Sequence, residues 1–89
     1  MRLVFEWDVR KERSNRRKHA IDFDEAKSVF EDNNLLTYGD DIHSSTEQRF
    51  ISIGLSVNFR ILLVVHTEGE SGNDEILIRI ISARKATRR

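Results

Sequence analysis

Apolar and polar positions divide this chain into short strands and two helices. Runs rich in β-branched and aromatic side chains, separated by polar stretches, predict five strands. The fourth run, RILLVVHT, is almost continuously apolar, which is typical of a central strand. In the third run, four apolar side chains alternate with serine and glycine, which predicts a half-buried strand. The predicted strands are residues 3–7, 35–38, 49–57, 60–67 and 76–83.

Two helices are expected between the first and the second strand. Asp8 is placed to cap a helix over residues 9–18, which has almost no apolar face, so burial contributes little to it. Asp22 followed by Glu25 is a capping-box pattern for the next helix. Its apolar residues recur at helical spacing, which predicts that this helix packs against the core. These residues are Phe23, Ala26, Val29 and Phe30.

The order of these elements predicts an α+β fold, with two N-terminal helices on one face of a small antiparallel sheet. Residues 68–75 are expected to form a flexible acidic loop before the last strand. Residues 84–89, RKATRR, are expected to begin a short C-terminal helix that Ser82 caps. The length of 89 residues is that of one small domain with one modest core.

The composition excludes several classes of protein. The chain has no cysteine, which excludes disulfide scaffolds, cysteine-zinc sites and thiol nucleophiles and fits a reducing cytoplasm. Its longest apolar run, residues 61–65, is far too short to cross a membrane, and the charged N-terminus is unlike a signal peptide. The three histidines lack metal-ligand spacing, and no glycine-rich phosphate loop is present. Neither a metal nor a cofactor is therefore expected.

Charge is unevenly distributed along the chain, although the net charge is zero. Residues 10–18 hold six cations and one acid, whereas residues 20–48 hold eight acids and one cation, Lys27. From Arg79 to the end of the sequence, every charged residue is basic. A local basic face attracts polyanions whatever the net charge is, so a nucleic acid is a candidate partner.

The basic groups and a histidine provide the parts for cleaving RNA. The 2′-hydroxyl is the nucleophile, so the protein has to deprotonate it, stabilise the charge on phosphorus and protonate the leaving 5′-oxygen. Arginine suits the second task because its planar fork binds phosphate through two hydrogen bonds. The candidate catalytic residues are Arg79, Arg84, His66, His19 and Lys18, and the candidate RNA-binding residues are Arg16, Arg17, Lys85 and Arg88.

These candidates also have structural interpretations. Arg79 stands between two isoleucines in a strand, where an arginine also pairs with a carboxylate. His66 ends an apolar strand, where a hydrogen-bonded core histidine is the commoner outcome. A charged helix such as residues 9–18 is usually a solvated surface.

Four segments, taken together, resemble the BrnT family of bacterial toxins. FEWD near the start is followed by N..KH.I.F.EA..VF.D, then by E.R...IG, and then by RIISARKAT near the end. The resemblance runs from Phe5 to Thr87 and implies that residues 1–89 are a single BrnT-like toxin domain. Family members frequently have a glycine where this chain has Ala20.

The resemblance implies a RelE-like fold and a ribonuclease toxin of a type II toxin–antitoxin module, which arrests growth by cutting RNA. The implied partner is a BrnA-type antitoxin with a ribbon-helix-helix region, through which alone the module contacts operator DNA. Two other functions stay open. One is a non-catalytic module that binds nucleic acid or protein with the same basic surfaces, and the other is a structural domain that self-associates through its charge asymmetry.

Overall fold

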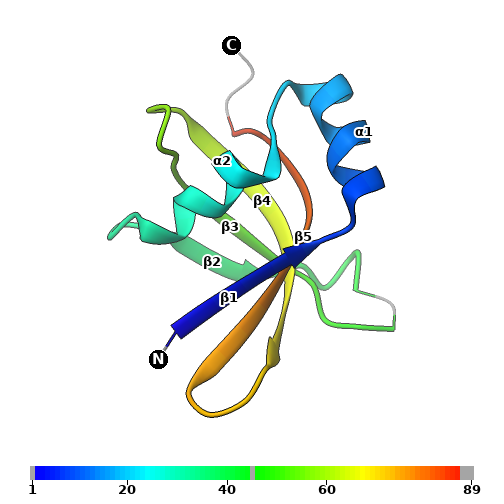
Figure 1. Ribbon diagram of the computed structural model, residues 1–89, viewed down its shortest axis with the longest axis vertical. Helices are drawn as coiled ribbons and strands as arrows, with labels where there is room; N and C mark the ends of the chain where they lie inside the picture. The colour runs from blue at the N-terminus through cyan, green and yellow to red at the C-terminus, as the bar shows by residue number, and fades with distance from the viewer. Residues whose placement is uncertain (1, 45, 87–89) are drawn as a thin grey trace.

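The computed structural model describes residues 2–44 and 46–86, which form a five-stranded sheet and two helices. In chain order the elements are β1 (Arg2–Trp7), α1 (Val9–His19), α2 (Phe23–Ser28), the 3₁₀ helix η1 (Val29–Glu31), β2 (Leu36–Gly39), β3 (Phe50–Leu55), β4 (Ile61–Glu70) and β5 (Glu75–Lys85). The strands lie in the order β1-β5-β4-β3-β2. In Figure 1, α2 crosses one face of the sheet and α1 lies near the end of β5. The predicted α+β class is confirmed.

The sheet is mixed. β2 to β5 form an antiparallel meander, as the sequence predicts, and β1 adds a parallel edge beside β5. The two strands lie side by side although all other elements separate them in the sequence (Figure 1). Hydrophobic periodicity identifies strands but does not encode which strands become neighbours, so this pairing could not be predicted from it.

β3 buries its small side chains instead of its large ones. The alternation in residues 49–57 predicts a half-buried strand but does not say which of its two faces is buried. In the structure the serines and the glycine face the helices, whereas the isoleucines are only half-buried and Leu55 is 40% exposed. The buried positions of this segment are Ser52, Gly54 and Ser56.

The close approach of η1 explains this orientation. A Cβ atom added to Gly54 would lie 2.8 Å from the side chain of Leu35 and 3.2 Å from the backbone oxygen of Val29. A side chain at this position would force the side chain of Leu35 to move and would press against Val29 of η1, so glycine suits the close approach of η1 to the sheet. The opposite face of the sheet, which we call the open face, therefore carries the larger apolar residues of β3.

α1 begins and ends at residues with specific backbone roles. The carboxylate of Asp8 accepts a hydrogen bond from the backbone N–H of Arg10 at 2.8 Å, which confirms the predicted cap. The helix ends at Ala20, whose φ of 59° is left-handed. This conformation costs an alanine about 1 kcal/mol, so a glycine would suit the turn better.

The side chain of Asn15 attaches α1 to β5. Beyond Ile80, β5 has no β1 neighbour, so its backbone groups on that edge need other partners. The amide nitrogen of Asn15 donates to the backbone oxygens of Ala83 at 2.8 Å and of Ile21 at 3.0 Å. Its amide oxygen accepts from the N–H of Ala83 at 3.0 Å. These buried hydrogen bonds hold α1 against β5, which in most helices is the role of an apolar face.

The C-terminal helix expected from Arg84 does not begin there. Arg84 and Lys85 complete β5, and the N–H of Ala86 donates to the oxygen of Ile61 at 2.9 Å. The antiparallel pairing with β4 continues to Lys85, and this ladder satisfies backbone groups that a helix would have to satisfy itself. Likewise β4 extends to Glu70 and β5 starts at Glu75, so the expected loop is shorter than predicted. Residues 87–89, which include the candidate Arg88, lie outside the described part of the chain.

Candidate functional site

Arg79 and Arg84 lie on the same face of β5, although they are five residues apart. β5 carries one extra residue, Ile81, between its pairs with His66 and Val65 of β4. This β-bulge shifts the alternation of side chains by one, so both arginines point to the open face. The positions opposite them on β4 are four residues apart, which separates the two arginines by about 13 Å along the strand.

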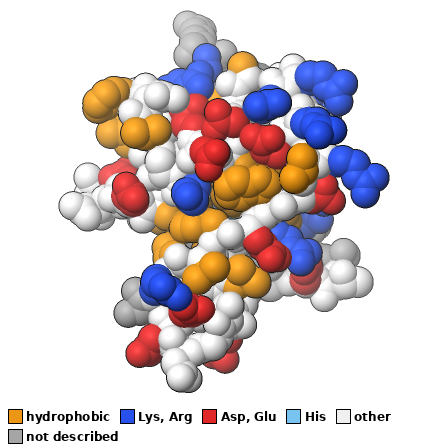
Figure 2. All heavy atoms as spheres, viewed as in Figure 1, with side chains coloured by type: hydrophobic (Ala, Val, Ile, Leu, Met, Phe, Trp, Pro, Cys, Tyr) orange, Lys and Arg blue, Asp and Glu red, His pale blue; other side chains and the backbone are white. Residues whose placement is uncertain are grey.

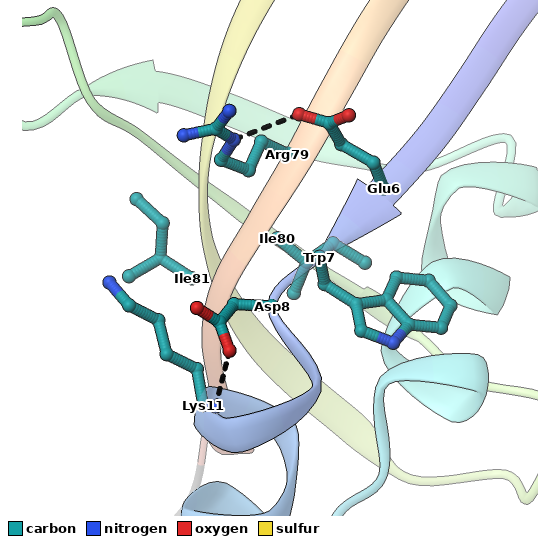
Figure 3. Close-up of a pocket in the computed structure, with 7 residues that line it drawn as sticks. All are labelled: Glu6, Trp7, Asp8, Lys11, Arg79, Ile80 and Ile81. Atoms are coloured by element: carbon teal, nitrogen blue, oxygen red, sulfur yellow. Dashed lines mark hydrogen bonds and ion pairs between the residues drawn. The ribbon is translucent and has the colours of Figure 1, made fainter.

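Arg79 lies in a hollow of about 320 Å³ between β5 and the start of α1. Its Nε donates to the carboxylate of Glu6 at 2.9 Å, and this hydrogen bond raises the pKa of Arg79. Figure 3 shows this ion pair at one end of the hollow and Lys11 and Asp8 at the other. The structural interpretation of Arg79 as an ion-pair residue is therefore correct, and the pair is exposed enough to meet a ligand. Lys11 belongs to the basic run that the sequence shows, but its place in the hollow depends on the tertiary structure.

Arg84 makes fewer polar contacts than Arg79. Its guanidinium donates only to the backbone oxygen of Lys85 at 3.4 Å, and within the described ranges no carboxylate lies within 4.0 Å of it. Lys85 lies opposite the buried Leu62, so it points to the other face of the sheet. Arg84 and Lys85 thus do not act on one surface.

The last turn of α1 lies near the end of β5, because Asn15 bonds to Ala83, the residue before Arg84. All four candidates of that turn are exposed. Figure 2 shows Lys and Arg side chains gathered over α1, whereas Asp and Glu gather over α2. The two basic segments of the sequence therefore approach one another. The candidates of this turn are Arg16, Arg17, Lys18 and His19.

His66 is a core residue and does not face the arginines. It is fully buried on the helix side of β4, opposite Ile80. Its Nε2 lies 2.7 Å from the hydroxyl of Ser52, and its ring is stacked on Phe50 and meets Phe30 edge-on. The expectation that His66 approaches Arg79 or Arg84 is wrong, because consecutive strand residues point to opposite faces.

Ser52, His66 and Glu68 are residue types found in catalytic triads, but Ser52 and His66 are not accessible to a substrate. Nδ1 is 3.9 Å from the carboxylate of Glu68, beyond hydrogen-bond distance, and no other described group bonds to it. Ser52 Oγ instead bonds to His66 and to Thr37 Oγ1, both at 2.7 Å. Ser52 and His66 have no exposed surface, so a substrate cannot reach the hydroxyl.

Burial of His66 should make the stability of the protein depend on pH. Desolvation lowers the pKa of His66 from 6.5 to about 4, so the folded chain keeps this ring neutral where the unfolded chain protonates it. The stabilisation is complete above pH 6.5 and is lost as the pH falls toward 4, by about 3 kcal/mol in total. Urea unfolding of the protein between pH 7 and pH 4 measures this loss.

The matched control for this prediction is His43, whose side chain is 69% exposed and pairs with Asp40. His66→Gln should flatten the pH dependence of the unfolding free energy between pH 6.5 and 4, and His43→Gln should leave it nearly unchanged. An equal slope in all three proteins would contradict the proposed cause.

The described residues hold neither a metal-binding cluster nor a membrane-spanning helix. Across residues 2–44 and 46–86, no three His, Asp or Glu side chains are grouped so that they could hold a metal ion. In the same part of the chain, no helix is both long and apolar enough to cross a membrane.

Comparisons with known proteins identify the family. A family model described as the ribonuclease toxin BrnT of type II toxin–antitoxin systems matches residues 7–89. The chain belongs to the BrnT family. The crystal structure of the Brucella abortus ribonuclease toxin BrnT has a similar fold, with a TM-score of 0.63 and 21% identity over 99% of both chains. No curated protein matches the sequence.

The family assignment confirms the resemblance in the sequence and places the chain among toxins that have an antitoxin partner. At 21% identity, the structural comparison supports the α+β fold and transfers no individual residue role. The candidate site therefore rests on the geometry of this chain: an open sheet face with Arg79 and Arg84, and a basic helix end beside it.

Proposed function

We propose that this chain is an endoribonuclease toxin that cleaves RNA on the open face of its sheet, without a metal ion, by attack of the RNA 2′-hydroxyl. The observation that carries the proposal is the family match over residues 7–89. The placement of Arg79 and Arg84 on one accessible face supports it, because two fixed guanidinium groups suit a phosphodiester backbone.

The roles follow from the positions of the side chains. Arg79 stabilises the negative charge that develops on the phosphorane, and Arg84 holds a second phosphate of the same strand. Because His66 is buried, the general base is taken by Glu6, whose carboxylate lies 2.9 Å from Arg79 and is exposed. The base removes the 2′-hydroxyl proton, the 2′-oxygen bonds to phosphorus, and the 5′-oxygen leaves with a proton.

The basic end of α1 extends this surface. Lys18 and His19 contact phosphates near Arg84, and Arg16 and Arg17 bind the flanking strand. The leaving 5′-oxygen takes its proton from solvent. Lys85 binds RNA only where the strand passes around the edge of β5, because it points away from Arg84. Arg88 stays a sequence-based candidate.

The partner that we propose is a BrnA-type antitoxin with a ribbon-helix-helix region. The antitoxin neutralises the chain and alone contacts operator DNA. The absence of cysteine in the sequence fits action in the cytoplasm, where transcripts are exposed.

The test of this function is RNA cleavage by the purified chain, free of antitoxin, with and without EDTA. We expect cleavage in both conditions, with 2′,3′-cyclic phosphate or 3′-phosphate ends and 5′-hydroxyl ends. DNA of the same sequence should remain intact because it lacks the nucleophile. Uncut RNA that still binds would favour the non-catalytic binding module, and cleavage that EDTA abolishes would contradict the metal-free mechanism.

A further inference from the structure

The open face of the sheet carries a continuous set of apolar side chains that no described element covers. Residues opposite one another in the strand register share a face, which makes rows across the sheet. One row runs from β2 through β3 and β4 to β5 and consists of Leu36, Ile53, Leu63 and Arg84. Tyr38, Ile51 and Val65 form the next row, and Leu55 lies beside Ile61. We call these eight apolar residues the open-face patch.

The patch is accessible to a partner. The exposed fraction is 65% for Leu36, 50% for Tyr38, 44% for Ile61 and 40% for Leu55. Scattered exposed apolar residues are normal, but a contiguous group on a flat sheet face is typical of a protein–protein interface. On its helix side, β3 buries serine and glycine beneath the helices, so its larger apolar side chains lie on the open face.

We propose that the open-face patch is where the antitoxin docks, through a segment with apolar side chains and at least one acidic residue that pairs with Arg84. The identity of this occupant rests on the proposed function. The first row of side chains ends at Arg84, which makes no salt bridge with a described carboxylate. A partner that brings an acid to this end completes the interface.

Two other occupants fit the patch less well. Single-stranded RNA binds through cations and aromatic stacking platforms, and seven of the eight patch residues are aliphatic. A second copy of this chain, packed through the same patch, would bring another Arg84 to the contact, and the Glu6 carboxylate on this face is already paired with Arg79. The patch therefore favours a different protein.

Docking at this surface also explains how a partner neutralises the chain. The patch reaches Arg84 within one row, and Arg79 lies on the same face. An antitoxin segment on the patch would pair with one proposed RNA-contacting arginine and cover the approach to the other. Inhibition then follows from coverage of the site and needs no change in the shape of the toxin.

The experiment uses a BrnA-type antitoxin as the probe, purified separately and titrated against the chain and its variants. Leu55→Glu combined with Ile61→Glu should weaken the complex by about 100-fold or more. Leu3→Glu is the matched control, because Leu3 is 38% exposed on the same sheet but lines a hollow on the helix side. It should change the dissociation constant by less than about 3-fold. Arg84→Glu should weaken the complex as well, and its effect should diminish at high salt.

The outcomes separate this inference from the proposed function. Equal effects of the patch and control variants on antitoxin binding would overturn the inference, even for a chain that cleaves RNA normally. The inference would also be overturned if the patch variants kept antitoxin binding and instead lost RNA affinity, or lost self-association measured by sedimentation. Conversely, a chain that never cleaves RNA but loses the antitoxin through Leu55→Glu and Ile61→Glu would contradict only the proposed activity. Thermal unfolding of each variant confirms that it is folded.

Discussion

Arg60→Ala should lower the free energy of unfolding by about 3–5 kcal/mol, the largest stability effect of the substitutions considered. The carboxylate of Glu25 is 4% exposed and accepts hydrogen bonds from Nε and Nη2 of Arg60 at 2.9 and 2.7 Å. The hydroxyl of Ser56 donates to the same carboxylate at 2.7 Å. Alanine leaves a buried charge without its main partner, so most of the stability of a small domain is at risk. Chemical denaturation at pH 7 measures the loss.

Arg2→Ala is the matched control, because Arg2 also pairs with a glutamate, Glu75, but is 75% exposed. It should cost less than about 1 kcal/mol. The hydrogen bonds from Arg60 lower the pKa of Glu25, so the pair stabilises the fold above the ordinary carboxyl value of 4.5 and loses this effect as the pH falls below it. The difference between wild type and Arg60→Ala should therefore shrink in acid. A loss equal to that of Arg2→Ala, or one independent of pH, would contradict this account of the pair.

Local signals in the sequence predicted local structure well. Asp8 caps α1, and Asp22 caps α2 by accepting from the N–H of Glu25 at 2.7 Å. Both depend on residues within one turn of the chain, which a sequence pattern records directly. The other half of the capping box does not form, because the side chain of Glu25 bonds to Arg60 and Ser56 instead. A long-range ion pair outcompetes a local hydrogen bond, and such competition is invisible in a short pattern.

The arrangement of the candidate site depends on structural features that hydrophobic periodicity does not predict. The bulge at Ile81 places Arg79 and Arg84 on one face, whereas strict alternation would have separated them. The position of His66 in the core depends on which face of β4 the helices cover. The orientation of the two faces of β3 arises because η1 packs directly on Gly54. The sequence therefore identified the basic segments but could not decide which side chains meet.

Arg79→Ala and Glu6→Gln should each lower the rate of RNA cleavage by about 10²–10³-fold at saturating RNA. Arg79 stabilises the phosphorane and Glu6 takes the 2′-hydroxyl proton, so each loss falls on the chemical step. The side chains are 57% and 44% exposed, so breaking the pair should cost less than about 1 kcal/mol of stability. Single-turnover cleavage with excess enzyme measures the rate, and thermal unfolding confirms the fold.

Two comparisons separate catalysis from binding. Replacing Arg16, Arg17 and Lys18 together by alanine should weaken RNA binding and flatten its dependence on salt, while the rate at saturation stays nearly constant. Glu6→Gln should instead keep the affinity for RNA and lower the rate at saturation, because the glutamine cannot accept the proton of the 2′-hydroxyl. Arg2→Ala removes an exposed, paired arginine from the same sheet edge and should leave cleavage unchanged. Full activity in both Arg79→Ala and Glu6→Gln would show that the hollow around these residues is not the catalytic site. Arg84 and the end of α1 would then be the next candidates to test.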